Sequence, residues 1–214
     1  MEALAQPVGE LTLYFSFADK ISKGLTPYVD FFPEYPPFAL HLFSLANIFG
    51  ERWFTPMFYL MVALAVLGMM IMIKKLKGNP YVFLCCILPL GGLLWDRYDI
   101  FASYFTLLSI YLAKKRNLLS IFALIAGIMT KIYPIAILPI ILGMFMFQGK
   151  FWKATLLFIV GMLICILPQK KFIDVLVKYH GNRGIQIESI KATPLLFQDS
   201  IVEWGHGTFE IRKK

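Results

Sequence analysis

The run PMFYLMVALAVLGMMIMI, from Pro56 to Ile73, contains no charged residue and is followed by Lys74, Lys75 and Lys77. A helix needs about 20 mostly apolar residues to cross the hydrocarbon core of a bilayer, with a range of about 17–25. This run therefore predicts a transmembrane helix. The lysines after it indicate the cytoplasmic side, because short cytoplasmic loops carry an excess of Lys and Arg.

Five shorter apolar runs follow, and prolines interrupt several of them. The shortest, Leu118–Thr130, has 13 residues and would reach about 20 Å as a helix, against a core of about 30 Å. Pro134, Pro139 and Pro168 favour broken or kinked helices. We expect an all-α, polytopic transmembrane bundle of about six spans: Pro56–Ile73, Pro80–Leu94, Ile100–Ala113, Leu118–Thr130, Tyr133–Phe147 and Phe151–Leu167.

The composition supports a membrane protein and argues against nucleic-acid binding. Hydrophobic residues make up 58% of the 214 residues and charged residues only 16%, whereas soluble domains have about 25% charged residues. The net charge is +8, but the cations stand at the ends of apolar runs, as the positive-inside pattern requires. Cys85, Cys86 and Cys165 lie within apolar runs and have no metal-ligand spacing, so we expect small core hydrophobes. We assign no metal-binding residue and no cofactor, and the sequence leaves a metal requirement open.

The basic clusters at 74–77, 114–116 and 150–153 alternate with the apolar runs and set their direction. If these clusters are cytoplasmic, residues 96–99, Lys131 and the tail from Gln169 are extracytoplasmic. The run Phe38–Phe49 is too short to span comfortably and suits an interfacial helix; if it spanned instead, the loop before it would be cytoplasmic.

The expected organisation is one partial transmembrane domain over 1–214. An extracytoplasmic first loop with its interfacial helix covers 1–55, the transmembrane helices cover 56–168, and an extracytoplasmic polar tail covers 169–214. An N-terminus on that side needs a helix to carry it across, so we expect a fragment or a shortened gene product. The predicted location is the cell membrane, with the active site on the extracytoplasmic side.

Polar clusters interrupt the apolar pattern at four places. The stretch from Pro27 to Pro37 is a stiff, proline-rich loop that carries Asp30 and Glu34. It suits an interfacial anchor with solvated acids, and it also suits a loop that presents a carboxylate as general base to a lipid-linked substrate.

The other three clusters admit a structural and a functional interpretation. Residues 95–99 place Asp96, Arg97 and Asp99 at a helix junction, where charges cap helix ends or line a site. Lys131 lies at the outer end of a short helix and either snorkels to the surface or binds a phosphate. The segment 179–189 combines an imidazole, a guanidinium, amides and a carboxylate, which suit phosphate and sugar hydroxyls or an ordinary polar loop.

In this order, the four clusters resemble the GT-C membrane glycosyltransferases. The patterns are G-x-x-PY-x-D-F-x-x-EYPP from Gly24, W-x-RYD from Trp95, TK-x-YP from Thr130 and YH-x-x-RG-x-QIES from Tyr179. The chain is most similar to the polyprenyl-phosphate-mannose-dependent mannosyltransferases, glycosyltransferase family 87, from about Glu10 to Glu188. Chains of that family are considerably longer, with a helix before the first loop and several more after the last pattern.

The resemblance implies an inverting enzyme that moves a hexose, such as mannose, from a polyprenyl-phosphate donor to a lipid or glycan acceptor. An acidic residue of the first extracytoplasmic loop would deprotonate the acceptor; Glu10, Asp30 and Glu34 are the candidates. The donor phosphate would meet Arg97, Lys131 and Arg183. The remaining candidate substrate-binding residues are Asp96, Asp99, Tyr133, His180, Gln186 and Glu188.

Two other functions fit the sequence. A lipid or sugar transporter, or a flippase-like protein, would also use short, proline-broken helices and outward charges. The short chain also suits a non-catalytic membrane subunit whose missing helices a second chain supplies. The expected partners are the donor, the acceptor and membrane lipids, with that second chain where the subunit interpretation holds.

Overall fold

The computed structural model describes residues 9–169, 171–175, 177, 185–186, 200–205 and 208–213. These residues divide into two compact units. Residues 9–172 form the larger unit, and the described residues from Ile173 onward belong to the smaller one.

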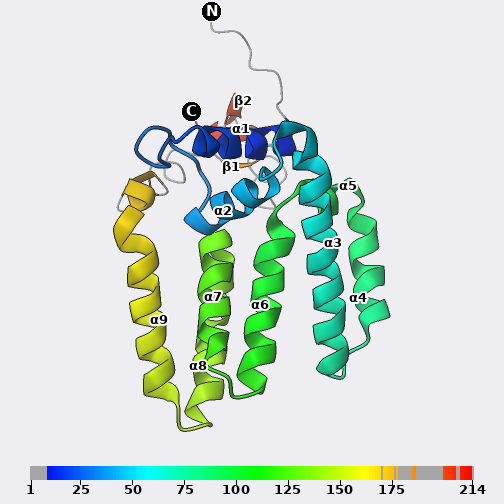
Figure 1. Ribbon diagram of the computed structural model, residues 1–214, viewed down its shortest axis with the longest axis vertical. Helices are drawn as coiled ribbons and strands as arrows, with labels where there is room; N and C mark the ends of the chain where they lie inside the picture. The colour runs from blue at the N-terminus through cyan, green and yellow to red at the C-terminus, as the bar shows by residue number, and fades with distance from the viewer. Residues whose placement is uncertain are drawn as a thin grey trace, which may run out of the picture. The chain divides into compact units, whose positions relative to one another are not determined.

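Apart from an isolated β-bridge between Pro27 and Phe31, the regular secondary structure of the larger unit is all helical, which confirms the predicted all-α class for this part of the chain. Figure 1 shows α3, α4, α6, α7, α8 and α9 running side by side, while α1 and α2 lie across one end of them. The elements are α1 (Glu10–Ser22), α2 (Pro37–Ala46), α3 (Glu51–Lys75), α4 (Pro80–Ile87), η1 (Leu88–Leu90), α5 (Gly92–Asp96), α6 (Asp99–Lys114), α7 (Leu119–Thr130), η2 (Tyr133–Ile137), α8 (Leu138–Met146), α9 (Phe151–Ile166) and η3 (Leu167–Gln169).

Prolines set several helix boundaries. Pro37 and Pro80 occupy the first turns of α2 and α4, where the missing N–H costs nothing. The expected continuous helix Pro80–Leu94 is interrupted, because Pro89 lies in η1 and Gly91 follows with φ 52°. Pro134 likewise begins a 3-10 segment, so the expected run Tyr133–Phe147 divides into η2 and α8.

At the end of the unit opposite α1 and α2, the turns after α3, α6 and α8 share one backbone design. Lys77, Arg116 and Gly149 have φ of 66°, 58° and 69°, the left-handed conformation of a Schellman motif. In α3 the Gly78 N–H donates to the Ile73 carbonyl at 2.9 Å, and equivalent bonds five residues apart close α6 and α8. Glycine adopts this conformation freely, whereas for Lys77 and Arg116 it costs roughly 1–2 kcal/mol each.

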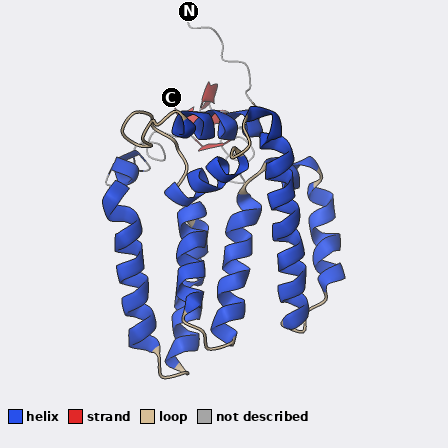
Figure 2. Cartoon of the chain, viewed as in Figure 1, coloured by secondary structure: helices blue, strands red, loops and turns tan. Residues whose placement is uncertain are grey.

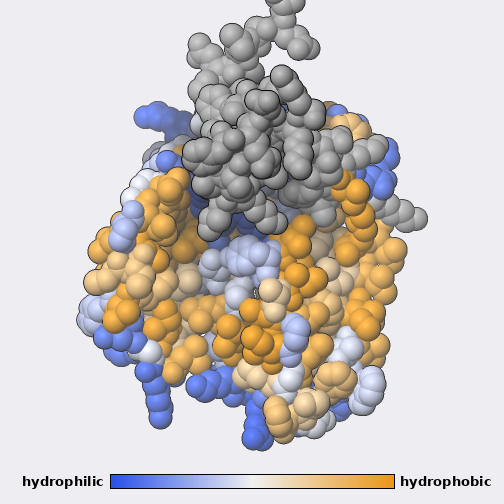
Figure 3. Space-filling model, turned by 180° about the vertical axis from the view of Figure 1, so that it is seen from behind, coloured by the Kyte–Doolittle hydropathy of each residue, from blue (hydrophilic) through white to orange (hydrophobic). Residues whose placement is uncertain are grey.

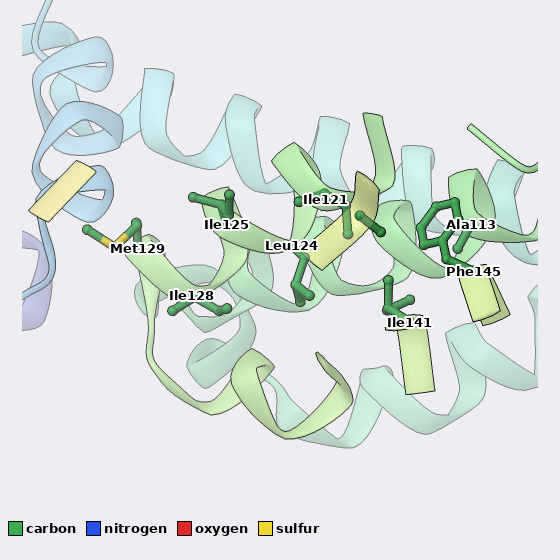
Figure 4. Packing of buried hydrophobic residues seen from close by; sticks show 9 residues of the cluster. Ala113, Ile121, Leu124, Ile125, Ile128, Met129, Ile141 and Phe145 are labelled. Carbon is green, nitrogen blue, oxygen red and sulfur yellow. The ribbon is translucent and has the colours of Figure 1, made fainter. Parts of the chain in front are cut away.

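Helix α7 is the centre of the packing. Nine of its twelve residues are buried, and Figure 4 shows the cluster that its apolar side chains form with residues of α6 and α8. Glycines bring helices close together: a Cβ added at Gly161 of α9 would lie 2.5 Å from Ile125 Cδ1, and one at Gly68 of α3 would lie 2.7 Å from Tyr104 Cε2. Small residues permit such close approaches between helices.

One described helix, α3, is by its length and composition long and apolar enough to cross a membrane by itself. The other apolar helices have 10–17 residues when the 3-10 segments are included. They correspond in position to the shorter predicted spans and to the run Phe38–Phe49, which forms the helix α2, Pro37–Ala46.

The sequence pattern did not foresee three features of the fold. The first loop contains α1, a helix of 13 residues. Cys85 and Cys86 are exposed, which contradicts their assignment to the core; α4 packs chiefly against α3 and leaves most of its own surface uncovered.

The third feature is an antiparallel sheet in the smaller unit (Figure 2). It consists of β1 (Ile185–Gln186), β2 (Ser200–Gly205) and β3 (Thr208–Lys213), in the order β1-β3-β2. Gly205 pairs with Thr208, and Ser200 with Lys213, so β2 and β3 align along their whole length.

Candidate functional site

Helix α1 positions Glu10 and Tyr14 on one face, because residues four apart on a helix are neighbours. Tyr14 is 1% exposed, and its hydroxyl donates to Glu10 Oε2 at 2.8 Å. Glu10 stands in the first turn of α1, where the helix dipole favours a negative charge. The buried Tyr14 hydroxyl therefore orients the Glu10 carboxylate.

Arg97 supplies the positive partner of Glu10. It follows α5 in extended conformation, and its Nη2 lies 3.5 Å from Glu10 Oε1. The two side chains are 51% and 40% exposed. Such a pair contributes at most about 1 kcal/mol in solvent, so an incoming anion can replace Glu10 as the partner of Arg97 at little cost.

A second ion pair joins Asp99 and Lys131. Asp99 begins α6 and Lys131 follows the last residue of α7 as its C-cap, so each charge stands where the helix dipole stabilises it. Lys131 Nζ donates to Asp99 Oδ1. The side chains of this pair are also about two-fifths exposed. The pair links the N-terminal end of α6 to the C-terminal end of α7.

Tyr98 lies between the two pairs. It is buried, its sequence neighbours are Arg97 and Asp99, and Lys131 Nζ is 5.3 Å from its ring centroid. Its ring meets that of Tyr14 edge to face, with 5.6 Å between the centroids. The two ion pairs therefore lie against the same two buried rings, those of Tyr14 and Tyr98.

These two rings belong to a larger aromatic cluster. Tyr35 and Tyr98 meet edge to face at 5.2 Å, and Tyr14 stacks on Phe43 of α2 at 4.4 Å. Burial raises the pKa of the Tyr14 and Tyr98 hydroxyls far above the usual value, and neighbouring carboxylates add to the shift. These phenols therefore stay protonated, and Tyr14 remains a hydrogen-bond donor to Glu10.

Two further polar contacts lie at this end of the helices. Asp96 accepts a hydrogen bond from the Tyr59 hydroxyl of α3 at 2.8 Å. The hydroxyls of Tyr133 and Ser103 are 2.8 Å apart. Both contacts hold candidate substrate-binding residues in place through partners on neighbouring helices.

The other two candidate bases differ in their surroundings. Glu34 is half-buried and precedes Tyr35 of the aromatic cluster; burial raises the pKa of Tyr35, and the charge of Glu34 adds to the shift. Asp30 is exposed, and its Oδ2 accepts the Thr26 N–H at 2.7 Å. Asp30 thus closes its own loop and makes none of the contacts around Glu10.

Four candidates belong to the tail. His180, Arg183 and Glu188 lie outside the described residues, and Gln186 belongs to β1. Within the part of the chain that the structure describes, no group of three or more His, Cys, Asp or Glu side chains is placed to hold a metal ion.

The described residues thus bring Glu10, Arg97, Asp99 and Lys131 together over buried tyrosines. The arrangement can do two things chemically. An oriented, half-exposed carboxylate can accept a proton, and the neighbouring guanidinium and ammonium can bind a phosphate.

Tyr14 and Tyr59 are site residues that sequence reasoning missed. The spacing of Glu10 and Tyr14 could have revealed the first contact, since four residues make one helical turn. Tyr59 reaches Asp96 from a different helix, 37 residues away, and no local pattern signals such a contact.

No family model matches this chain, and neither a curated protein nor a solved structure shows significant similarity to it.

Proposed function

We propose that this protein is a membrane glycosyltransferase of the GT-C type. It transfers a hexose, such as mannose, from a polyprenyl-phosphate donor to a hydroxyl of a lipid or glycan acceptor. The observation that carries the proposal is the Glu10 carboxylate, held by Tyr14 at 2.8 Å and by Arg97 at 3.5 Å at the helix ends where Asp99 meets Lys131.

Glu10 acts as the general base in this mechanism. It removes the proton of the acceptor hydroxyl as that oxygen attacks the anomeric carbon of the donor. The bond from this carbon to the phosphate oxygen breaks, the configuration inverts, and polyprenyl phosphate leaves with the electron pair. Tyr14 positions the carboxylate through Oε2, and the other oxygen, Oε1, takes the acceptor proton once Arg97 has turned from it to the donor phosphate.

Arg97 and Lys131 stabilise the leaving phosphate. Their side chains are 51% and 36% exposed, and each is already oriented by a carboxylate. Phosphate binding by Arg97 also withdraws the cation from Glu10. The base is thereby released when the donor has entered, because a charge-assisted bond to phosphate is stronger than an exposed ion pair.

The same proposal includes a polytopic membrane placement. Helix α3 and the shorter apolar helices cross the bilayer side by side, and α1 and α2 rest at the extracytoplasmic interface. Exposed apolar side chains on α3, α4 and α9 support this placement, since an aqueous surface rarely leaves so much apolar area uncovered.

The function is tested with purified protein in liposomes, with donor carrying a labelled hexose and a lipid extract as acceptor. We expect labelled glycolipid with inverted anomeric configuration. Labelled donor that crosses the bilayer without a new glycosidic bond would identify a transporter and contradict the proposal. Protein that forms a product only with a copurified second chain would be a subunit of such an enzyme.

A further inference from the structure

The end of the helical unit opposite the candidate site is strongly and uniformly basic. Eight Lys and Arg residues lie in or beside the turns after α3, α6 and α8: Lys74, Lys75, Lys77, Lys114, Lys115, Arg116, Lys150 and Lys153. Between Glu51 and Asp174 the only acidic residues are Asp96 and Asp99, and both belong to the candidate site. The three turns therefore hold no carboxylate that could neutralise these cations.

Two of these turns are fastened to each other. Lys150 Nζ donates to the Arg116 carbonyl at 2.9 Å, and Gln148 Nε2 donates to the Ala113 carbonyl at 3.1 Å. Lys115 lies over the ring of Tyr111, with Nζ 4.6 Å from the centroid. The cations of the two turns thus form a connected surface.

Two of the cations occupy positions that favour glycine. Lys77 and Arg116 have φ of 66° and 58° in Schellman turns, whereas the equivalent turn after α8 has Gly149. Glycine would remove the backbone strain at both positions. At both positions the chain thus has a charged residue where the left-handed backbone conformation favours glycine. A strained position of this kind indicates a functional demand.

The surroundings of the basic turns are apolar. Phe147 is 89% exposed and Trp152 80% exposed, next to Lys150 and Lys153. Figure 3 shows hydrophilic residues at the lower end of this face and a broad apolar surface above them. Aromatic and basic residues below an apolar band are typical of the boundary between lipid headgroups and acyl chains.

We propose that the three basic turns form a docking surface for anionic phospholipid headgroups, in which Lys77 and Arg116 supply charge at the expense of backbone strain. Each cation near an anionic membrane surface strengthens binding about fivefold. Nucleic acid carries the negative charge of an anionic phospholipid but has no acyl chains to cover the apolar surface beside the turns. A phospholipid therefore fits both the basic and the apolar part of this surface. This proposal does not depend on sugar transfer; it rests on the membrane placement alone.

Three variants separate the charge at these turns from the net charge of the protein. Lys77→Gly with Arg116→Gly removes two cations and the strain. Lys20→Gln with Lys23→Gln removes two cations at α1, at the other end of the unit, and is the matched control. Gly149→Lys adds a cation and strain where a Cβ would meet nothing within 4 Å.

The measurement is the thermal midpoint of detergent-purified protein, titrated with short-chain phosphatidylglycerol or phosphatidylcholine. We expect phosphatidylglycerol alone to raise the midpoint of the wild type. The double glycine variant should need about 5- to 25-fold more of it, while its midpoint without anionic lipid should be at least as high as that of the wild type. The α1 control should respond like the wild type, and Gly149→Lys should respond at lower lipid concentration from a lower starting midpoint.

Four results would overturn the proposal. They are an unchanged phosphatidylglycerol response in the double glycine variant, an equal loss in the α1 control, a lower starting midpoint for the glycine variant, and an equal shift of the wild type with a short single-stranded DNA. Protein that fails to cofractionate with membranes would instead refute the membrane placement, and loss of sugar transfer would bear on neither result.

Discussion

Replacing Tyr14 by Phe removes one oxygen atom from the candidate site and leaves the packing of the ring in place. The ring is 1% exposed and stacks on Phe43 at 4.4 Å, so no cavity forms. The loss is the hydrogen bond to Glu10 at 2.8 Å. Hydrogen bonds to charged groups contribute about 1.5–3 kcal/mol, and water can replace this donor in part because Glu10 is 40% exposed. We expect a stability loss of about 1.5 kcal/mol or less.

The effect on activity should be larger than the effect on stability. A base displaced by about 1 Å can lose on the order of 100-fold in rate, so we expect kcat for sugar transfer to fall about 10- to 100-fold with KM little changed. The assay is labelled hexose transfer in liposomes, with thermal midpoints measured on the same preparations.

Tyr28→Phe is the matched control. Tyr28 is also 1% exposed, and its hydroxyl donates to the Tyr35 carbonyl instead of a carboxylate. The control should lose comparable stability and keep its kcat. Equal falls in kcat for the two variants would refute the positioning role of Tyr14, and so would full activity in Tyr14→Phe.

Three further predictions concern stability and binding. Gly68→Ala should destabilise the protein by about 1–3 kcal/mol, because the new Cβ would lie 2.7 Å from a Tyr104 ring carbon. In Gly143→Ala, in α8, the new Cβ would meet nothing within 4 Å, so this change should stabilise the protein by roughly 0.5–1 kcal/mol. Thermal midpoints test both predictions. Lys131→Met should cost about 1 kcal/mol or less in stability, since its pair with Asp99 is exposed, but should raise the KM for the phosphate-bearing donor, and an unchanged KM would remove Lys131 from the donor site. Burial raises the pKa of Tyr133 above the unfolded value of 10 and that of four other tyrosines far above it. The stabilising contribution of these four is complete below pH 10 and is lost as the pH rises toward the folded-state pKa. Near-ultraviolet titration should show that these four of the ten tyrosines ionise only with unfolding, and ten equal titrations would contradict their burial. The four tyrosines are Tyr14, Tyr28, Tyr35 and Tyr98.

The sequence predicted the helical class because apolar runs of this length have few other solutions. It also predicted where most helices begin and end, since Lys and Arg follow several runs and Pro37 and Pro80 open α2 and α4. The start of α3 was wrong: the helix begins at Glu51 and Pro56 lies inside it. Helix α6 differs from its predicted bounds by one residue at each end. The internal break at η1 and Gly91 was missed, because an apolar composition alone does not distinguish a continuous helix from a broken one.

The candidate site was harder to predict than the fold. Glu10, Arg97, Asp99 and Lys131 were all named from the sequence, yet their pairing was not, because the ends of four different helices bring them together. Helix α1 was missed since its 13 residues mix polar and apolar types without a proline or a capping side chain at the start. Without α1, neither the contact of Tyr14 with Glu10 nor the different role of Asp30 could be inferred.

The most direct test of the account compares Glu10→Gln with Asp30→Asn in the hexose-transfer assay. Both changes convert a carboxylate to an amide of the same shape. The amide at position 10 could still accept the Tyr14 hydroxyl but could not take a proton, and the amide at position 30 could still accept the Thr26 N–H. The account predicts that Glu10→Gln abolishes transfer while the protein inserts normally, and that Asp30→Asn transfers hexose like the wild type. Transfer that survives in Glu10→Gln, or is lost in Asp30→Asn alone, would contradict the assignment of the base.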